Sequence, residues 1–378
     1  MMIGFGSTVI LSRYMGLELY GTFVEILFSL NLIINLGINW SNLLLVDYYS
    51  KNNNLLILPS ALLILIISTV LLPALFMIIN IQLNLPLIIA GIIYIISNCI
   101  EINLTSYYTA HQKYKFLFRY IILKFIVLLL LLIPLRDQLT STGVLLIFSI
   151  GYLTSISNDI QIRSTQINII HDLKSLVTLL KSSRKLFLAN ALGTPVNFIL
   201  LAIMNYKGAE PAQIALFGIG LQFGNLFMFF SRRLTPVMLS KFEHIDFYQI
   251  RRNSQIIGFT STLLIASSIY IISIDWSSLY GASDKELNKI IQSFINLSIL
   301  SSVGAGFQGW LLKQKLYGFG LRTSIFQSIV VLSTALILSD GTAIEILECL
   351  YVGVLMNLIV SFYFQRKNFT SLDFIITI

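Results

Sequence analysis

The chain alternates long apolar runs with short polar joints. A helix needs about 20 mostly apolar residues to cross roughly 30 Å of hydrocarbon. None of the joints is long enough to hold a soluble domain. The apolar runs are 2–12, 20–46, 55–80, 83–103, 117–135, 139–157, 186–205, 212–230, 254–274, 287–309, 323–339 and 342–365. This pattern predicts an all-α polytopic membrane protein with about twelve transmembrane helices.

The first run is shorter than the others. Met1 and Met2 lie directly inside apolar sequence, with no basic residue before them. A secretory signal peptide has a basic region ahead of its apolar core, so this run does not fit one. We expect a transmembrane helix that has lost its beginning, through a shortened reading frame or a misassigned start.

Composition excludes several classes of protein. Of the 378 residues, 56% are hydrophobic and only 11% are charged, whereas a soluble domain has about 25% charged residues. A soluble enzyme, a nucleic-acid-binding module and a secreted disulfide scaffold are therefore all excluded. Cys99 and Cys349 lie in apolar stretches, which predicts buried thiols rather than a metal site or a disulfide framework. No cofactor is expected.

The joints differ in charge. If the spans alternate in direction, twenty of the 25 Lys and Arg residues fall in one set of joints. The other set holds five: Arg13, Arg136, Lys207, Lys285 and Lys289. Basic residues concentrate on the cytoplasmic side of membrane proteins. This bias predicts that both termini are cytoplasmic.

The longest joint lies at the middle of the chain. Residues 158–185 predict a helix on the membrane surface, because Ile167, Ile170, Leu173, Val177 and Leu180 share one face. Its cations can anchor it to anionic lipid: Lys174, Lys181, Arg184 and Lys185. We therefore predict a six-helix bundle over 1–157, an amphipathic cytoplasmic linker over 158–185 and a second six-helix bundle over 186–378.

Two short matches suggest that the halves are repeats. The pattern Tyr-x-Gly-x-Glu occurs at 14–18 and again at 206–210, after the first and seventh spans. Gln-Lys occurs at 112–113 and at 314–315, after the fourth and tenth spans. Because six spans separate the halves, both have the same orientation. Their pseudo-twofold axis is then expected along the membrane normal, with a cavity between the halves.

The first of these matches lies in a longer motif. Residues 11–23 read Leu-Ser-Arg-Tyr-Met-Gly-Leu-Glu-Leu-Tyr-Gly-Thr-Phe. This stretch resembles the S-R-Y-L-G-x-E-x-Y-G-x-F signature of polysaccharide-biosynthesis flippases, with Met15 in place of the usual Leu. These are the Wzx-type O-antigen and exopolysaccharide repeat-unit flippases of the multidrug/oligosaccharidyl-lipid/polysaccharide exporter superfamily.

The resemblance implies twelve helices in two bundles in the bacterial inner membrane. It also implies the transport of an undecaprenyl-pyrophosphate-linked oligosaccharide, an O-antigen, lipopolysaccharide or capsule repeat unit, from the cytoplasmic to the outer leaflet. Membrane lipid, a glycan polymerase and chain-length regulator proteins are the partners that it implies.

Polar stripes mark candidate cavity walls. Asn31, Asn35 and Asn39 fall within about 80° on a helical wheel of the second span. Further stripes occupy the seventh and eighth spans: Asn190, Thr194, Asn197, Gln222 and Asn225. Amides in hydrocarbon cost free energy unless they are paired. The stripes predict either hydrogen bonds between helices or a polar cavity wall that suits sugar hydroxyls.

Two cations are candidates for a pyrophosphate contact. Arg13 ends the first span, where a guanidinium could bind phosphate or anchor the helix at the interface. Lys124 lies about 7–8 Å beyond Arg119 along the fifth span. It could extend to the cytoplasmic face or supply a cation inside the cavity.

Glu25 is the candidate for ion or proton coupling. It lies about 7 Å inside the second span, and intramembrane carboxylates are functional hypotheses by default. The alternative is a salt bridge or hydrogen bond to Arg13. Glu101 is at the cytoplasmic end of a span and is expected to be structural.

A flippase that works by alternating access is the leading hypothesis. The chain has no G-x-x-x-x-G-K-[ST] loop, so we do not expect this chain to hydrolyse ATP. The first alternative is an ion-coupled multidrug or cation antiporter of the same superfamily. The second is a membrane enzyme, either a glycan polymerase or a polyprenyl-dependent glycosyltransferase, although the outer joints are short for catalysis.

Overall fold

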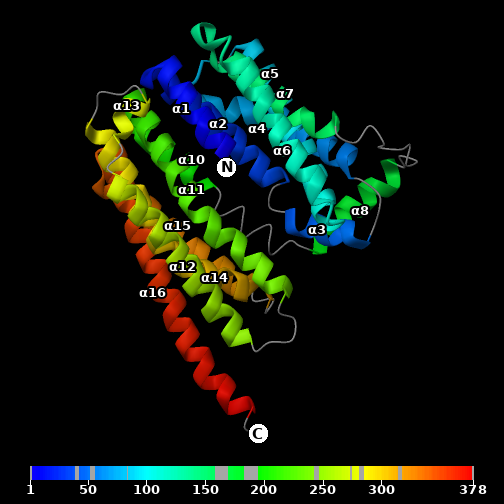
Figure 1. The fold of residues 1–378 in the computed structure, drawn as a ribbon, viewed down its shortest axis with the longest axis vertical. Helices are drawn as coiled ribbons and strands as arrows, with labels where there is room; N and C mark the ends of the chain where they lie inside the picture. The colour runs from blue at the N-terminus through cyan, green and yellow to red at the C-terminus, as the bar shows by residue number, and fades with distance from the viewer. Residues whose placement is uncertain are drawn as a thin grey trace. The chain divides into compact units, whose positions relative to one another are not determined.

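The computed structural model describes residues 2–38, 42–51, 56–82, 84–157, 169–182, 195–241, 247–272, 275–280, 285–313 and 317–376. Every regular element in these ranges is a helix (Figure 1). Four of the described helices contain stretches long and apolar enough to cross a membrane: Leu17–Gly37, Ile57–Ile78, Leu85–Ala110 and Ala343–Ser361. The predicted all-α polytopic membrane fold is confirmed.

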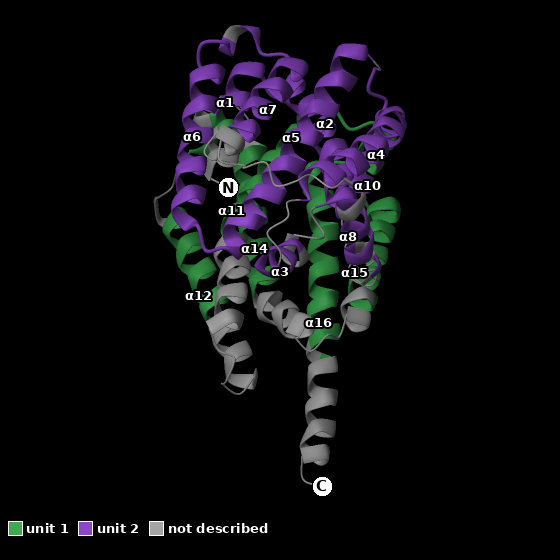
Figure 2. Cartoon of the chain, turned by 90° about the vertical axis from the view of Figure 1, so that its right-hand side faces the viewer, with its two compact units in different colours: residues 1–9, 203–378 green, residues 10–202 purple. Residues whose placement is uncertain are grey.

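The chain forms two compact units, coloured separately in Figure 2. Unit 2 comprises Ile10–Ala202 and unit 1 comprises Met1–Val9 with Ile203–Ile378. Helices α1 (Met2–Met15) and α10 (Pro195–Tyr206) therefore each contribute residues to both units. The predicted limits of two bundles and a linker stay a prediction.

Unit 2 is built around α5 (Leu85–Ala110). Its neighbours are α2 (Leu17–Gly37), α3 (Asn42–Lys51), α4 (Ile57–Ile78), α6 (Tyr114–Leu132) and α7 (Ser141–Ser157). The short 3₁₀ turn η2 (Arg136–Gln138) precedes α7. The helix α8 (Ile169–Ser182) contacts α4 and lies within the predicted amphipathic linker. On α8, Leu173 and Val177 of the predicted apolar face are exposed, and Leu176 is buried.

Unit 1 is built around α14 (Lys285–Lys313). Its neighbours are α11 (Pro211–Lys241), α12 (Phe247–Ile272), α13 (Trp276–Tyr280), α15 (Tyr317–Leu338) and α16 (Ala343–Ile376). In the predicted scheme of six plus six spans, α5 and α14 are the fourth and tenth. The fourth span of each half is therefore the helix around which its unit is built.

The predicted span over 20–46 is wrong in its extent. Helix α2 ends at Gly37, and α3 begins at Asn42 as a separate helix. The φ of Ile38, which caps α2, is −145°, outside the helical range. Glycine is a poor helix former, so Gly37 favours an end here. Asn42 consequently lies on a different helix from Asn31.

Contacts between turns show that the helices of unit 2 alternate in direction. At one end, Cζ of Arg136 lies 5.6 Å from the ring centroid of Tyr14. At the other, the Tyr49 hydroxyl accepts a bond from the Leu56 N–H at 3.1 Å, and its ring lies 5.8 Å from that of Tyr107. The Arg136–Tyr14 and Tyr49–Tyr107 contacts each join two turns that the charge pattern assigns to the same side, whereas the Tyr49–Leu56 bond closes a single joint.

One end of unit 1 is tied by side chains. Gln213 Nε2 donates to Glu286 Oε2 at 3.1 Å, and Gln213 Oε1 accepts from the Ala343 N–H at 3.0 Å. Lys207 Nζ donates to the Ser339 carbonyl. These bonds, which we call the Gln213 tie, connect the α10–α11, α13–α14 and α15–α16 joints.

Both copies of the Tyr-x-Gly-x-Glu pattern place a glycine with positive φ at the end of a helix. Gly16 lies between α1 and α2 and Gly208 between α10 and α11, and each has a φ of +77°. Glycine adopts positive φ without a steric cost, unlike other residues. In both halves, the positive φ therefore explains why the pattern contains a glycine.

Candidate functional site

A charged pair lies inside unit 2, between α5 and α6. Lys124 Nζ is 2.8 Å from Glu101 Oε1, and the two side chains are 15% and 17% exposed. The Tyr120 hydroxyl donates to the same carboxylate oxygen. Glu101 thus accepts two hydrogen bonds, from an ammonium and from a phenol.

The sequence brings this pair together through a helical hairpin. The turn at 111–113 joins α5 to α6, which contact each other. Glu101 lies nine residues before the end of α5 and Lys124 ten residues after the start of α6. At about 1.5 Å per residue, each is roughly 15 Å from the turn. The hairpin therefore places both charges at the same depth.

Two tyrosines complete the surroundings of the pair. Lys124 Nζ lies 4.0 Å from the ring centroid of Tyr152 on α7, a favourable cation–π distance. The Tyr152 and Tyr94 hydroxyls are 3.2 Å apart, and their rings meet edge to face at 5.4 Å. We call Tyr94, Glu101, Tyr120, Lys124 and Tyr152 the Lys124 site.

The Lys124 site holds a cation between one carboxylate and an aromatic ring. The ammonium is neutralised by Glu101 and lies against the Tyr152 ring, so its charge is held in a partly buried place. A buried ion pair is weak evidence for stability, because desolvation offsets much of the attraction.

Part of this site follows from the sequence and part was missed. The sequence predicts that Lys124 either extends to the cytoplasmic face or supplies an internal cation; the structure pairs it with Glu101, and its role stays a prediction. The expectation that Glu101 is structural at the cytoplasmic end of a span did not include this pairing. Equal distances of the two charges from the turn were the signal that could have revealed it.

The other predicted charges lie elsewhere in the chain. Arg13 is exposed near the end of α1, whereas Glu25 is buried in α2, at 7% exposure. The Ser29 hydroxyl donates to the Glu25 backbone carbonyl one turn later. Their assigned roles in pyrophosphate binding and coupling stay predictions.

The predicted polar stripes are only partly described. Asn31 is exposed on α2 and Asn35 is half-buried, and Asn197 on α10 is also half-buried. In unit 1, Gln222 and Asn225 on α11 are half-buried. Three further residues lie outside the described ranges: Asn39, Asn190 and Thr194. A common wall formed by these amides stays a prediction.

Solved structures with a similar fold are transporters. A multidrug-resistance MATE family transporter of the MOP superfamily, in an inward-facing conformation, aligns with a TM-score of 0.64 and 13% identity, covering 98% of this chain and 94% of that one. The lipid II flippase MurJ, inward closed, aligns with a TM-score of 0.63 and 15% identity, covering 95% and 85%.

A third structure agrees with these two. A MOP superfamily transporter from Pyrococcus furiosus aligns with a TM-score of 0.56 and 12% identity, over 98% of this chain and 92% of that one. No protein-family model matches the chain. No curated protein matches it significantly either. The chain therefore has the fold of the MOP superfamily transporters.

Proposed function

We propose that the chain is a flippase for a polyprenyl-pyrophosphate-linked oligosaccharide in the bacterial cytoplasmic membrane. The observation that carries the proposal is the Lys124 site, a cation held about 15 Å along a helical hairpin. A lipid-linked pyrophosphate crossing the bilayer needs a positive partner at such depth, because an unpaired charge in hydrocarbon is expensive.

In the proposed mechanism, Glu101 and the substrate compete for Lys124. The pyrophosphate displaces the Glu101 carboxylate from the ammonium, and Glu101 takes up a proton or moves toward another donor. Arg13 is a second candidate contact, whose guanidinium suits phosphate oxygens. Glu25 is the proposed coupling carboxylate. Alternating access of the chain to the two sides then moves the headgroup, without ATP hydrolysis by this chain.

Two further observations support this reading. Residues 11–23 resemble the signature of repeat-unit flippases. The solved structure of MurJ, described as a lipid II flippase, shares the fold over 95% of this chain. The half-buried amides on α2, α10 and α11 are the proposed glycan-facing groups.

A cation antiporter is the second candidate function. The observation that favours it is Glu25, a carboxylate only 7% exposed in α2. A buried carboxylate could bind a cationic drug, a proton or a metal cation in turn. The MATE structures with this fold are described as multidrug-resistance transporters.

The test compares charge at Lys124 with charge elsewhere on α6. A deletion strain is complemented with the wild type, Lys124→Arg, the double variant Glu101→Gln/Lys124→Gln, or Lys115→Gln, which changes an exposed residue of the same helix. Lipid-linked oligosaccharide is then measured in inverted and right-side-out vesicles. We expect the neutral double variant to trap the repeat unit on the cytoplasmic leaflet, with Lys124→Arg retaining transport and Lys115→Gln matching the wild type.

The double variant keeps the two side chains similar in size and leaves no uncompensated charge, so its amount in the membrane is expected to equal that of the wild type. Normal glycan export by that variant would exclude Lys124 as the pyrophosphate contact. Unchanged glycan in the deletion strain itself, together with lost resistance to cationic drugs, would favour the antiporter.

A further inference from the structure

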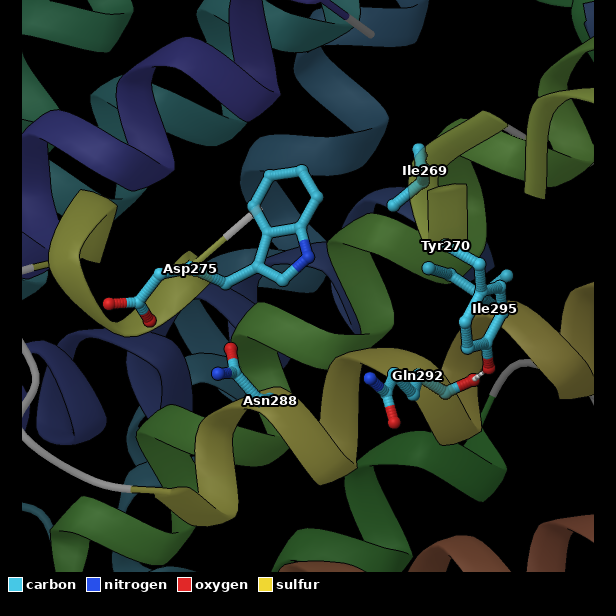
Figure 3. A pocket seen from close by; sticks show the side chains of 7 residues that line it. Ile269, Tyr270, Asp275, Asn288, Gln292 and Ile295 are labelled. Atoms are coloured by element: carbon cyan, nitrogen blue, oxygen red, sulfur yellow. Dashed lines mark hydrogen bonds between the residues drawn. The ribbon is translucent and has the colours of Figure 1, made fainter. Parts of the chain in front are cut away.

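Unit 1 contains a cavity that the Lys124 site does not involve. It has a volume of about 310 Å³ and lies among α12, α13 and α14 (Figure 3). Small-molecule pockets span roughly 300–1,000 Å³, so this one is at the small end of the range. Its lining is Ile269, Tyr270, Asp275, Trp276, Asn288, Gln292 and Ile295.

One lining amide lacks a partner. The Oδ1 atom of Asn288 is buried, and no donor among the described residues reaches it. Buried polar atoms are nearly always hydrogen-bonded, so an exception calls for an explanation such as a missing ligand. Gln292 lies one turn further along the same face of α14, and its amide is exposed. Two amides one helical turn apart therefore line the cavity.

The aromatic wall of the cavity is held in place. Trp276 is 8% exposed, and the ring of Phe223 contacts it edge to face at 4.7 Å between centroids. On the other side, the Tyr270 hydroxyl donates to Asn296 Oδ1 at 3.1 Å. Since that hydroxyl is engaged, Tyr270 presents mainly its ring to the cavity. The walls are largely aromatic, and the polar groups of the lining are the two amides and the Asp275 carboxylate, which accepts a hydrogen bond from the Ser277 N–H at 3.1 Å.

We propose that this cavity binds one pyranose ring of a neutral sugar. A sugar ring has apolar C–H faces that pack on aromatic rings and hydroxyls that both donate and accept. The Asn288 side chain forms part of the polar lining, and the exposed Gln292 amide can donate to a hydroxyl or accept from one. A ligand of one ring fits the small volume, whereas a polyprenyl chain or a whole repeat unit does not.

The position of the cavity suggests when a sugar occupies it. It lies beside α13, in the joint that the charge pattern assigns to the outer side. This part of the inference rests on the proposed flippase function: the cavity would hold a terminal sugar of the glycan after the headgroup has crossed. The binding itself does not depend on transport and can be measured separately.

The experiment uses the fluorescence of Trp276 in the purified full-length chain. The chain has three tryptophans, and Trp40→Phe with Trp310→Phe leaves Trp276 as the only indole. Glucose, galactose and N-acetylglucosamine are titrated, with glycerol as a solute control. We expect a saturable change in emission for at least one pyranose and none for glycerol.

Variants assign the response to the cavity. Asn288→Leu should weaken binding at least tenfold, whereas Lys289→Gln, an exposed neighbour that does not line the cavity, should bind like the parent. If Asn288→Leu does not fold, Gln292→Ala removes the exposed amide and should also weaken binding. Absence of a saturable response to every sugar, or equal binding by the cavity variants, overturns the proposal.

The two proposals fail in different ways. Sugar binding that persists while the deletion strain exports glycan normally would reject the flippase and keep the cavity as a sugar site. Trapped glycan in the deletion strain without sugar binding by the purified chain would keep the flippase and reject the cavity.

Discussion

Lys124 and Glu101 form an ion pair that is expected to affect the free energy of unfolding and the transport activity in different ways. The carboxylate accepts from Lys124 Nζ at 2.8 Å and from the Tyr120 hydroxyl. Removing one charge of a buried pair leaves the other without compensation, which costs about 3–5 kcal/mol, whereas replacing both is often neutral. Stability and transport should therefore separate in a double-mutant cycle.

In that cycle, Glu101→Gln and Lys124→Gln are each expected to lower the unfolding free energy by about 3 kcal/mol. The double variant should recover most of this loss, because neither charge remains. Reversible unfolding of the purified chain in mixed micelles gives the four values. If the loss in the double variant equalled the sum of the two single losses, the residues would not be coupled, and the pair would contribute nothing to the folded state.

The residues of the site differ in how far the sequence could predict them. Lys124 was recognised because a lysine within an apolar run is conspicuous. Glu101 was not, because a carboxylate near the end of a run resembles an ordinary interfacial residue. Its partner is 23 residues away, and only the geometry of the hairpin relates them. Tyr94 and Tyr152 gave no signal, since tyrosine is common in membrane helices.

Whole helices were easier to predict than single contacts. Long apolar runs predicted α4 and α7 to within two residues of their ends, because burial in lipid demands continuous hydrophobicity. The start of α5 was predicted equally well, but α5 continues to Ala110, seven residues beyond the predicted end. The short helices α3 and α13 were missed. Each has ten residues or fewer. A helix this short shows no hydrophobic periodicity that would distinguish it from the neighbouring apolar run or polar joint.

The glycine turns provide a test at this scale. Gly16 has φ +77° and ψ +161°, a region that residues with a Cβ avoid. A methyl group added at Gly16 would meet no atom within 4 Å, so the cost of Gly16→Ala comes from the backbone alone. We expect a loss of about 1–3 kcal/mol in unfolding free energy.

Gly143→Ala is the matched control, because Gly143 lies in the first turn of α7 with an ordinary backbone. There alanine meets no backbone cost and its Cβ would lie 3.3 Å from the Thr140 hydroxyl oxygen, so we expect a change of less than about 1 kcal/mol. Equal effects of the two changes, measured by the same unfolding titration, would contradict the role of the turn.

At the scale of the molecule, the charge pattern and the turn contacts agree on alternation. In unit 2, Arg136 and Tyr14 meet at one end, and Tyr49 and Tyr107 at the other. In unit 1, the Gln213 tie gathers three joints at one end. Alternation fixes which turns share a side but not which side faces the cytoplasm, and the excess of basic residues supplies that prediction.

Single cysteines report the orientation directly. Both native cysteines are buried, so an impermeant maleimide should not react with them. Lys181→Cys on α8 and Lys289→Cys on α14 place thiols at exposed positions. We expect Lys289→Cys to react in right-side-out vesicles and Lys181→Cys only in inverted ones. Labelling of both from the same side would show that the assignment of the joints is wrong.

The hairpin of α5 and α6 also bears on how the chain enters the bilayer during synthesis. A lysine at the centre of a lone helix raises the free energy of insertion by about 2.5–3.5 kcal/mol. Glu101 emerges 23 residues ahead of Lys124, so its carboxylate is already present when the ammonium leaves the translocon. The two helices can then partition into lipid with the Lys124 charge already paired, so we expect the contact at the candidate site to ease insertion of α6.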